Sequence, residues 1–401
     1  MTHTKKNILL PILAILLTCL YVIGCVLVHM NQLGYFPHKF LPTDFPTHIY
    51  LSLEGWVPYS GLFLVFRIIF IIFGDFGGYA SIAFFTLLDL SSVILCWLIL
   101  THDSEIKLNK SLLLIASTLI NVISGFSIPL FGNRYITGNM WGNITYSGMK
   151  PFAICTLFFF FLIRKNNYSE KFWKLFIFFT IALTISTGIK PSFTISFMPV
   201  IAFLVIMDCN KKRVKFYKVC VLASAFIPSL YLMYKQYRIL FQQTGAGKTA
   251  INVGYTFKLM SNVYPLMLIL SFIFPLIFCA LNYKTTKAFP MKTTLFLWGI
   301  SFIVALLFIE NGARINHGNY LWGLFFSTFY WFYESERQLL ISISQCKENK
   351  TKYDYKIIIP LVIFIICVGF GIYSFTADIF GGIDMDFDII ERVQIFSYLW
   401  K

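Results

Sequence analysis

The hydrophobic residues of this chain are gathered in long runs separated by short polar segments. A helix needs about 20 apolar residues to cross the hydrocarbon core, and the shorter runs reach that length with their flanking residues. The pattern predicts an all-α, polytopic membrane bundle of about eleven transmembrane helices, forming a single transmembrane domain over residues 1–401. The predicted spans are 7–30, 80–100, 111–130, 149–163, 175–189, 193–207, 219–235, 263–282, 293–310, 319–341 and 357–376.

One further apolar run, 59–74, is short and carries Arg67 in its middle. If it does not cross the membrane, most of the 33 Lys and Arg residues fall on the same side as the N-terminus, as the positive-inside rule requires. We therefore predict that 59–74 is an outer interfacial or re-entrant helix. The N-terminus is then cytoplasmic and the tail 377–401 is extracytoplasmic. The outer loops that follow are 31–58, 131–148, 236–262 and 311–318.

The composition agrees with a membrane protein and changes the meaning of the charge. With 58% hydrophobic and 13% charged residues and a mean hydropathy of +0.73, the chain is neither a soluble globule nor a disordered chain. A net charge of +15 would suggest a nucleic-acid partner in a soluble protein, but here it orients the chain in the bilayer. The bilayer is thus an expected partner and nucleic acid is not. None of the nine cysteines falls in a predicted outer loop, so no disulfide framework is expected.

The first outer loop contains the most obvious candidate chemistry. Asp44 and His48 are four residues apart, with Pro46 between them and Glu54 further along. If 47–55 is a short helix, His48 lies one turn from Asp44, and the two form a general base or a metal site. The alternative is an ordinary solvated loop with capping residues. A divalent cation is left open as a cofactor, with no metal ligand assigned.

The other outer segments supply cations, amides and one aromatic residue. Arg134, Trp141, Asn143 and Lys150 in the second loop suit a sugar face and an anionic headgroup. The alternative there is an interfacial Trp anchor with a snorkelling Lys.

Lys190 sits between two spans, at the outer membrane edge. Glu310, Arg314, His317 and Asn319 fall within ten residues at another outer helix end. Because a carboxylate closing an apolar span is costly unless paired, Arg314 is the expected partner of Glu310. Cations at this depth suit a lipid-linked phosphate.

Four short motifs carry a family resemblance. They are Asp44 to His48, Trp141-x-Asn143-x-Thr145 running into Lys150-Pro151, Lys190-Pro191-Ser192, and Glu310-x-Gly-x-Arg314-x-x-His317-Gly318-Asn319. In this order they resemble bacterial C-type membrane glycosyltransferases (the GT-C superfamily) and polysaccharide polymerases. The resemblance covers residues 1 to about 330.

The resemblance implies a glycosyltransferase in the bacterial cytoplasmic membrane that works in cell-surface polysaccharide assembly or modification. It would transfer a sugar at the outer face from a polyprenyl-phosphate-linked donor to a glycan or glycolipid acceptor. Asp44 maps to the catalytic base or metal carboxylate of the family. Many members carry a pair of acids there, whereas this chain has one Asp with Glu54 ten residues on, so metal use is in question.

We expect His48 to assist Asp44, and Glu310 to position Arg314 or act as a second acid. Arg314, Lys150 and Lys190 would stabilise the phosphate, and Trp141 would stack on a sugar. The remaining substrate-binding candidates are Asn143, Asn319, His317, Glu54 and Arg134.

Three other functions remain open at this point. A lipid-linked oligosaccharide polymerase would use the same chemistry. A flippase or secondary transporter would instead place polar residues near the bilayer midplane on broken helices, and Asp89, Arg67 and Asn121 are its candidates. A membrane scaffold would leave the outer clusters scattered. His29 has no evident acidic partner in the sequence.

Overall fold

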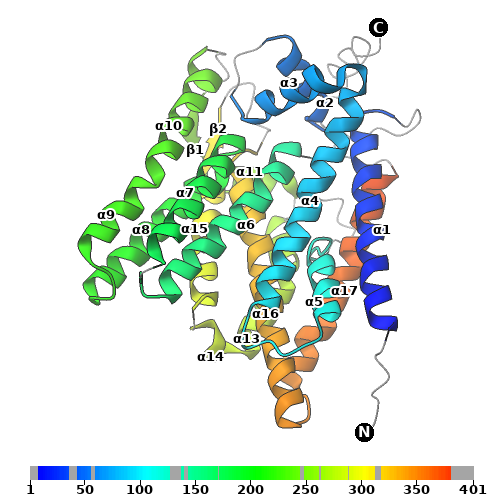
Figure 1. Ribbon diagram of the computed structural model, residues 1–401, viewed down its shortest axis with the longest axis vertical. Coiled ribbons are helices and arrows are strands. Elements are labelled where there is room, and N and C mark those ends of the chain that lie inside the picture. The colour runs from blue at the N-terminus through cyan, green and yellow to red at the C-terminus, as the bar shows by residue number, and fades with distance from the viewer. Residues whose placement is uncertain are drawn as a thin grey trace.

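The computed structural model describes residues 8–35, 43–55, 59–126, 137–139, 143–169, 171–243, 248–261, 263–287, 289–311 and 318–380, with 241–243 described in backbone only. Within these ranges the chain is a bundle of helices with one two-stranded sheet (Figure 1). The helices of the first half are α1 (Leu9–Gln32), α2 (Phe45–Leu53), α3 (Leu62–Phe73), the short turn η1 (Gly74–Phe76), α4 (Gly77–Thr101), α5 (Lys110–Ile120), α6 (Ile144–Lys165), α7 (Phe172–Ile189) and α8 (Ser192–Asn210).

The second half contains shorter helices, the sheet and two long helices. The elements are α9 (Phe216–Ser224), α10 (Phe226–Tyr237), η3 (Arg238–Gln243), β1 (Thr249–Ile251), α11 (Tyr255–Met260), α12 (Tyr264–Ser271), α13 (Ile273–Leu281), α14 (Tyr283–Thr286), α15 (Met291–Leu307), β2 (Phe308–Glu310), α16 (Leu321–Asn349) and α17 (Tyr355–Ile379). Strands β1 and β2 pair antiparallel, with Thr249 opposite Glu310. The sequence pattern did not predict this sheet.

The structure confirms the prediction of a helical polytopic bundle. Seven helical segments of the described chain are long and apolar enough to cross a membrane, or eight if α12 and α13, bent by 63° at their break, are one span. The number eleven and the GT-C architecture stay predictions. Of the predicted span 111–130, the structure describes residues up to 126, and only α5 is helical within that part. Helix α15 ends at Leu307, where β2 begins. Helix α16 is long but too polar to meet the same criterion.

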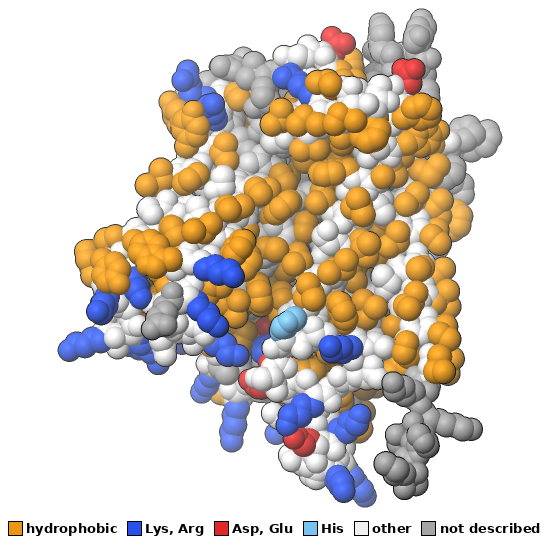
Figure 2. All heavy atoms as spheres, viewed as in Figure 1, with side chains coloured by type: hydrophobic (Ala, Val, Ile, Leu, Met, Phe, Trp, Pro, Cys, Tyr) orange, Lys and Arg blue, Asp and Glu red, His pale blue; other side chains and the backbone are white. Residues whose placement is uncertain are grey.

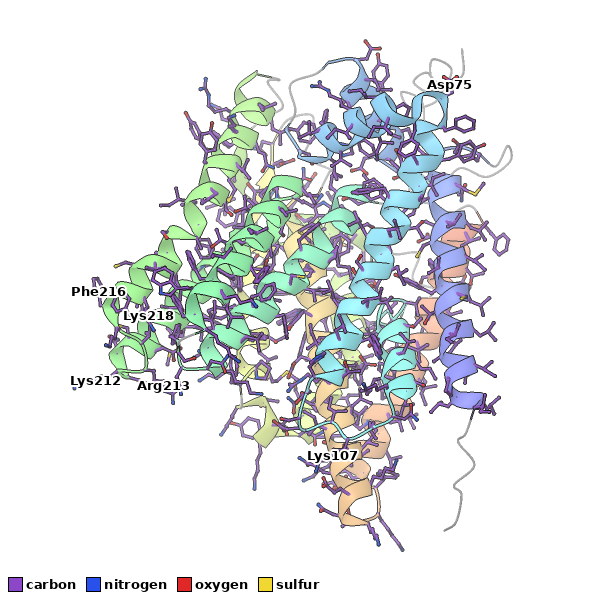
Figure 3. All side chains as sticks on the ribbon, in the orientation of Figure 1. Asp75, Lys107, Lys212, Arg213, Phe216 and Lys218 are labelled. Atoms are coloured by element: carbon purple, nitrogen blue, oxygen red, sulfur yellow. The ribbon has the colours of Figure 1, made fainter. Side chains whose placement is uncertain are left out.

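The two ends of the bundle differ in charge. Lys107, Lys212 and Arg213 lie toward the end that also holds the N-terminus, and we call it the basic end (Figures 1 and 3). Figure 2 shows a broad hydrophobic belt above this end, as expected of a surface that faces lipid. Helices α2 and α3 lie across the opposite end, which we call the α2–α3 end (Figure 1). The run 59–74 is therefore placed across the bundle there, where Gly74, at a φ of +52°, ends α3 before the chain turns into α4.

Ion pairs fasten the helix ends at the basic end. Arg164 Nε donates to Asp208 Oδ2 over 2.6 Å, which joins α6 to α8, and the Tyr168 hydroxyl donates to the same oxygen over 3.0 Å. Arg337 on α16 donates to Asp103, just after α4, over 2.7 Å. Buried charges need such partners because their desolvation is expensive. These pairs fix how α4, α6, α8 and α16 meet.

Helix α5 ends inside the bundle rather than at its surface, and the backbone groups exposed by that end are bonded elsewhere. Asn139 Nδ2 donates to the carbonyls of Ile120 and Ile123, at 3.0 and 2.9 Å. The extended chain that follows donates from Ser124 N to Cys367 O and from Phe126 N to Leu270 O. Irregular backbone at membrane depth is tolerated only where it is buried in protein in this way.

Gly371 on α17 provides a test of this packing. A Cβ at position 371 would collide with the Val122 carbonyl and lie 2.8 Å from Ile123 Cα, whereas Gly369 on the same helix has nothing within 4 Å. We expect Gly371→Ala to lower the free energy of unfolding by about 1–3 kcal/mol through overpacking, and Gly369→Ala to be neutral or slightly stabilising. Thermal unfolding in detergent measures both. Equal melting temperatures for the two variants would contradict the close approach of α17 to the end of α5.

Candidate functional site

Asp44 lies at the start of α2, and its carboxylate is held against the N-terminus of α6. Its side chain does not cap α2. Instead, Asp44 Oδ2 accepts a hydrogen bond of 2.7 Å from Asn143 Nδ2, and Oδ1 lies 3.4 Å from the Ile144 amide nitrogen. The positive end of the α6 dipole favours a carboxylate at this place. A residue of the first predicted outer loop is thereby joined to the second.

The Asn143 side chain connects Asp44 to Lys190. While Nδ2 donates to Asp44, Oδ1 caps α6 by accepting from Tyr146 N at 2.9 Å and also accepts from Lys190 Nζ at 3.2 Å. Lys190 Nζ donates in addition to Thr145 Oγ1 at 2.8 Å and lies 4.3 Å from the centre of the Trp322 ring. Three segments distant in sequence therefore meet at one amide. We call Asp44, His48, Asn143, Thr145 and Lys190 the Asp44 cluster.

His48 stands behind Asp44, one helical turn along α2. Its Nε2 lies 3.4 Å from Asp44 Oδ2, and its Nδ1 lies 3.4 Å from the Tyr59 hydroxyl. The His48 side chain is only 4% exposed, whereas that of Asp44 is 29% exposed. Asp44 is therefore the accessible member of the pair. The buried His48 can act on a bound molecule only through its contact with Asp44.

The electrostatic balance keeps Asp44 ionised. Burial alone would raise the pKa of Asp44, but the neighbouring His48 and Lys190 and the hydrogen bond from the Ile144 amide outweigh it, so the pKa lies below its usual value. The site thus offers a carboxylate and an ammonium group on either side of one amide. Such a pair can accept a proton on one side and stabilise a developing negative charge on the other.

Glu310 and Asn319 form a second group beside the same helix junction. Asn319 Nδ2 donates to Glu310 Oε2 at 2.6 Å, and the Asn319 carbonyl accepts from Ser192 Oγ at 3.4 Å. Ser192 begins α8 two residues after Lys190. The α7–α8 junction therefore connects this pair to the Asp44 cluster. Glu310 is buried, and β2 holds its backbone against β1.

Lys150 does not join these residues. It is 4% exposed inside the bundle, where Nζ donates to Asn121 Oδ1 at 2.9 Å and to Asn139 Oδ1 at 2.6 Å and lies 3.9 Å from the Phe329 ring centre. Its ammonium group thus sits beside the C-terminal end of α5, where the helix dipole favours a cation. The sequence suggested the outer membrane edge because Lys150 precedes a proline near a loop. The structure shows that α6 begins at Ile144, before the predicted start at residue 149. Lys150 therefore lies in the second turn of the helix, inside the bundle.

The remaining predicted site residues fall into two groups. Glu54 is exposed at the C-cap of α2, at the opposite end of that helix from Asp44. Arg134, Trp141, Arg314 and His317 lie outside the described residues. The roles predicted for those four therefore stay predictions. Two aromatic neighbours, Tyr59 and Trp322, were not among the predicted site residues, and the sequence marks them only as aromatics that begin apolar segments.

His29 has an acidic partner, contrary to the sequence analysis. Its Nε2 lies 2.9 Å from Asp89 Oδ2, and its Nδ1 lies 2.9 Å from Gln32 Oε1. Both His29 and Asp89 are buried, and the Phe45 ring packs edge-on against His29. The sequence places the two residues sixty positions apart in separate apolar runs, so only the packing of α1 on α4 shows the pair.

The described part of the chain brings few possible metal ligands together. No group of three or more His, Cys, Asp or Glu side chains there lies close enough to hold a metal ion. Asp44 and His48 supply two such ligands. A divalent cation at this place would need further ligands from a substrate phosphate or from segments outside the described residues.

Comparison with protein-family models, with curated proteins and with solved structures finds no match to this chain. The geometry of the Asp44 cluster therefore carries the functional argument.

Asn143 and Asn109 form a matched pair for testing the cluster, since both cap a helix with their side-chain oxygen. Asn109→Ala removes only a cap, which costs about 1 kcal/mol. Asn143→Ala also removes the amide shared by Asp44 and Lys190, and we expect a total loss of about 2–4 kcal/mol. Denaturant or thermal unfolding in detergent measures the difference. If both variants lost the same stability, the amide would not bridge Asp44 and Lys190.

Proposed function

We propose that the chain is a membrane glycosyltransferase that takes a sugar from a polyprenyl-phosphate carrier and adds it to a glycan or glycolipid acceptor of the cell surface. The observation that carries this proposal is the meeting of Asp44, Asn143 and Lys190 at one amide, since these residues come from three different predicted outer segments. A scaffold would not require an accessible carboxylate and a cation to converge. The GT-C-like motifs add to this argument through their resemblance alone.

The proposed reaction uses the two charged sides of the cluster. The oxygen of the acceptor hydroxyl bonds to the anomeric carbon of the donor sugar, and Asp44 accepts the proton that this hydroxyl loses. The bond from that carbon to the carrier phosphate breaks, and the phosphate leaves with the electron pair. Lys190 stabilises the charge that develops on the phosphate, assisted in our proposal by Arg314. Because the Asn143 amide is already bonded on both sides, we assign it to positioning Asp44 and Lys190 instead of binding a sugar hydroxyl.

We further propose that the enzyme works in the bacterial cytoplasmic membrane, with the α2–α3 end on the outer face. The gathering of Lys and Arg at the end that holds the N-terminus supports this orientation (Figures 1 and 2). Transfer of a whole oligosaccharide unit by a polymerase would use the same residues. The size of the transferred unit depends on the acceptor, and a product analysis would give it.

A flippase or secondary transporter is the second candidate, and the interior polar groups favour it. Helix α5 ends inside the bundle beside Lys150 and Asn121, α12 and α13 are bent, and Asp89 pairs with His29. Discontinuous helices with polar residues at their ends are typical of transporters. Arg67 does not belong to this set, because its Nε donates to the Ser52 carbonyl near the C-terminal end of α2.

Asp44→Asn tests the transferase directly. It keeps the shape and the hydrogen-bonding reach of the side chain but removes the base, so we expect transfer from a labelled polyprenyl-phosphate sugar to fall by about 10²–10⁴-fold. Asp75→Asn, an exposed acid at the same end of the bundle, is the control and should keep full activity (Figure 3). A fully active Asp44→Asn protein would exclude the assignment. Movement of the intact lipid-linked sugar across liposomes without transfer would favour the transporter.

The lowered pKa of Asp44 predicts the pH dependence of transfer. A base must be unprotonated, so activity should persist below the usual titration range of an Asp and disappear as the pH falls through the Asp44 pKa. His48→Gln removes a group that lowers this pKa, so the acid limb of the pH–rate profile should move to higher pH. His102→Gln, at an exposed position after α4, should leave it in place. An unshifted limb in His48→Gln would show that His48 does not support Asp44.

A further inference from the structure

Helix α16 connects the candidate site to the basic end of the bundle. Trp322, in its first turn, lies under Lys190, and Arg337, further along, bonds Asp103. Glu336 lies fourteen residues after Trp322, about 21 Å along the helix at 1.5 Å per residue. Most of the side chains between them are buried, so α16 runs through the interior of the bundle.

Glu336 is a buried acid on α16. It is 2% exposed, and neither carboxyl oxygen has a hydrogen-bond partner in the described part of the chain. The residues one turn away on the same face, Phe332, Tyr333 and Leu340, are buried as well. A lone carboxylate in such surroundings is prohibitively expensive, whereas a neutral carboxylic acid costs far less.

Glu334, two residues earlier on the same helix, is a buried acid whose carboxyl group has hydrogen-bond partners. Its Oε1 accepts from Arg337 Nη1 at 2.7 Å and from Gln338 Nε2 at 2.9 Å. Arg337 is bonded to Asp103 as well, so these three form a satisfied ion-pair cluster. The cation nearest to Glu336 in sequence is thus already engaged. The Cys96 thiol on α4 interacts with Glu336 electrostatically but carries no positive charge. Among the residues that the structure describes, no cation bonds the Glu336 carboxyl group.

A bound metal cation does not fit this environment. Metal ions such as Na⁺ or Ca²⁺ need several oxygen ligands, and no group of acids, His or Cys that could hold a metal occurs among the described residues. A proton needs neither a cavity nor a second ligand. It therefore fits the single carboxyl group at position 336.

We propose that Glu336 is a proton-binding site in the interior of the bundle, one residue before Arg337 of the Glu334–Arg337–Asp103 cluster. The proposal does not depend on the reaction proposed at the Asp44 cluster.

Reaction with an apolar carbodiimide tests the proton directly, using Glu334 as the matched control in the same helix. The acid O–H adds across one C=N bond, with the oxygen bonding to carbon and the proton passing to nitrogen, and the adduct rearranges without losing atoms. An ionised carboxylate does not carry the required proton. We expect peptide mass spectrometry of the full-length protein at neutral pH to find the adduct on Glu336 and not on Glu334. An adduct on Glu334 alone would overturn the proposal.

An infrared measurement decides the case in which neither residue reacts. The spectrum of the wild-type protein minus that of Glu336→Gln, at neutral pH, should contain the C=O band of a protonated carboxyl group that shifts in D₂O. The absence of that band would overturn the proposal. Glu336→Gln should fold and keep its melting temperature, because it replaces one neutral group with another, whereas Glu334→Gln should lose stability by breaking the pair with Arg337. A large loss of stability in Glu336→Gln with no loss in Glu334→Gln would mean that Glu336 is ionised and paired.

Discussion

Polar groups buried in an apolar bundle lose their bonds to water, and a partner within the protein is needed to offset that loss. This requirement organises the structure around two asparagines. Asn143 caps α6 while it joins Asp44 to Lys190, and Asn139 caps the interrupted end of α5 while it receives the Lys150 ammonium group. An amide suits both places because it donates and accepts at once. The loop between α5 and α6 therefore supplies one connecting residue to the candidate site and one to the interior.

A layer of aromatic side chains lies next to the candidate site. Phe45 follows Asp44 in sequence, and its ring packs against His29, Phe66 and Phe85. This aromatic layer therefore adjoins Asp44 along the chain and the Asp89–His29 pair in space. In a transferase the aromatic layer would be a dry floor beneath the reacting groups. In a transporter it would be a barrier that has to move, which is why the second candidate function needs a conformational change that the first does not.

The acids of the chain differ in function according to their surroundings. Asp44 is ionised because an imidazole, an ammonium group and a helix N-terminus outweigh its burial. Asp208, Asp103 and Glu334 each accept a hydrogen bond from an arginine and so act as structural ion pairs. Glu336 has no such partner in the described part of the chain, and the neutral acid that we propose there avoids the cost of an unpaired buried charge. The same side-chain chemistry can thus provide a base, a structural ion pair or a proton store within one bundle.

The sequence by itself determined the class of the protein and much of the candidate site. In lipid, the backbone N–H and C=O groups of a long apolar run bond to one another when the run is a helix. The polytopic helical bundle therefore follows from composition and spacing. Asp44 and His48 were predictable as neighbours because they lie one helical turn apart. The tertiary structure alone decided that Asn143 lies between Asp44 and Lys190, that Lys150 points into the interior and that Asp89 pairs with His29. Those outcomes depend on how the helices pack and where α5 and α6 begin and end, and a hydrophobic pattern carries no information on which buried polar group will meet which.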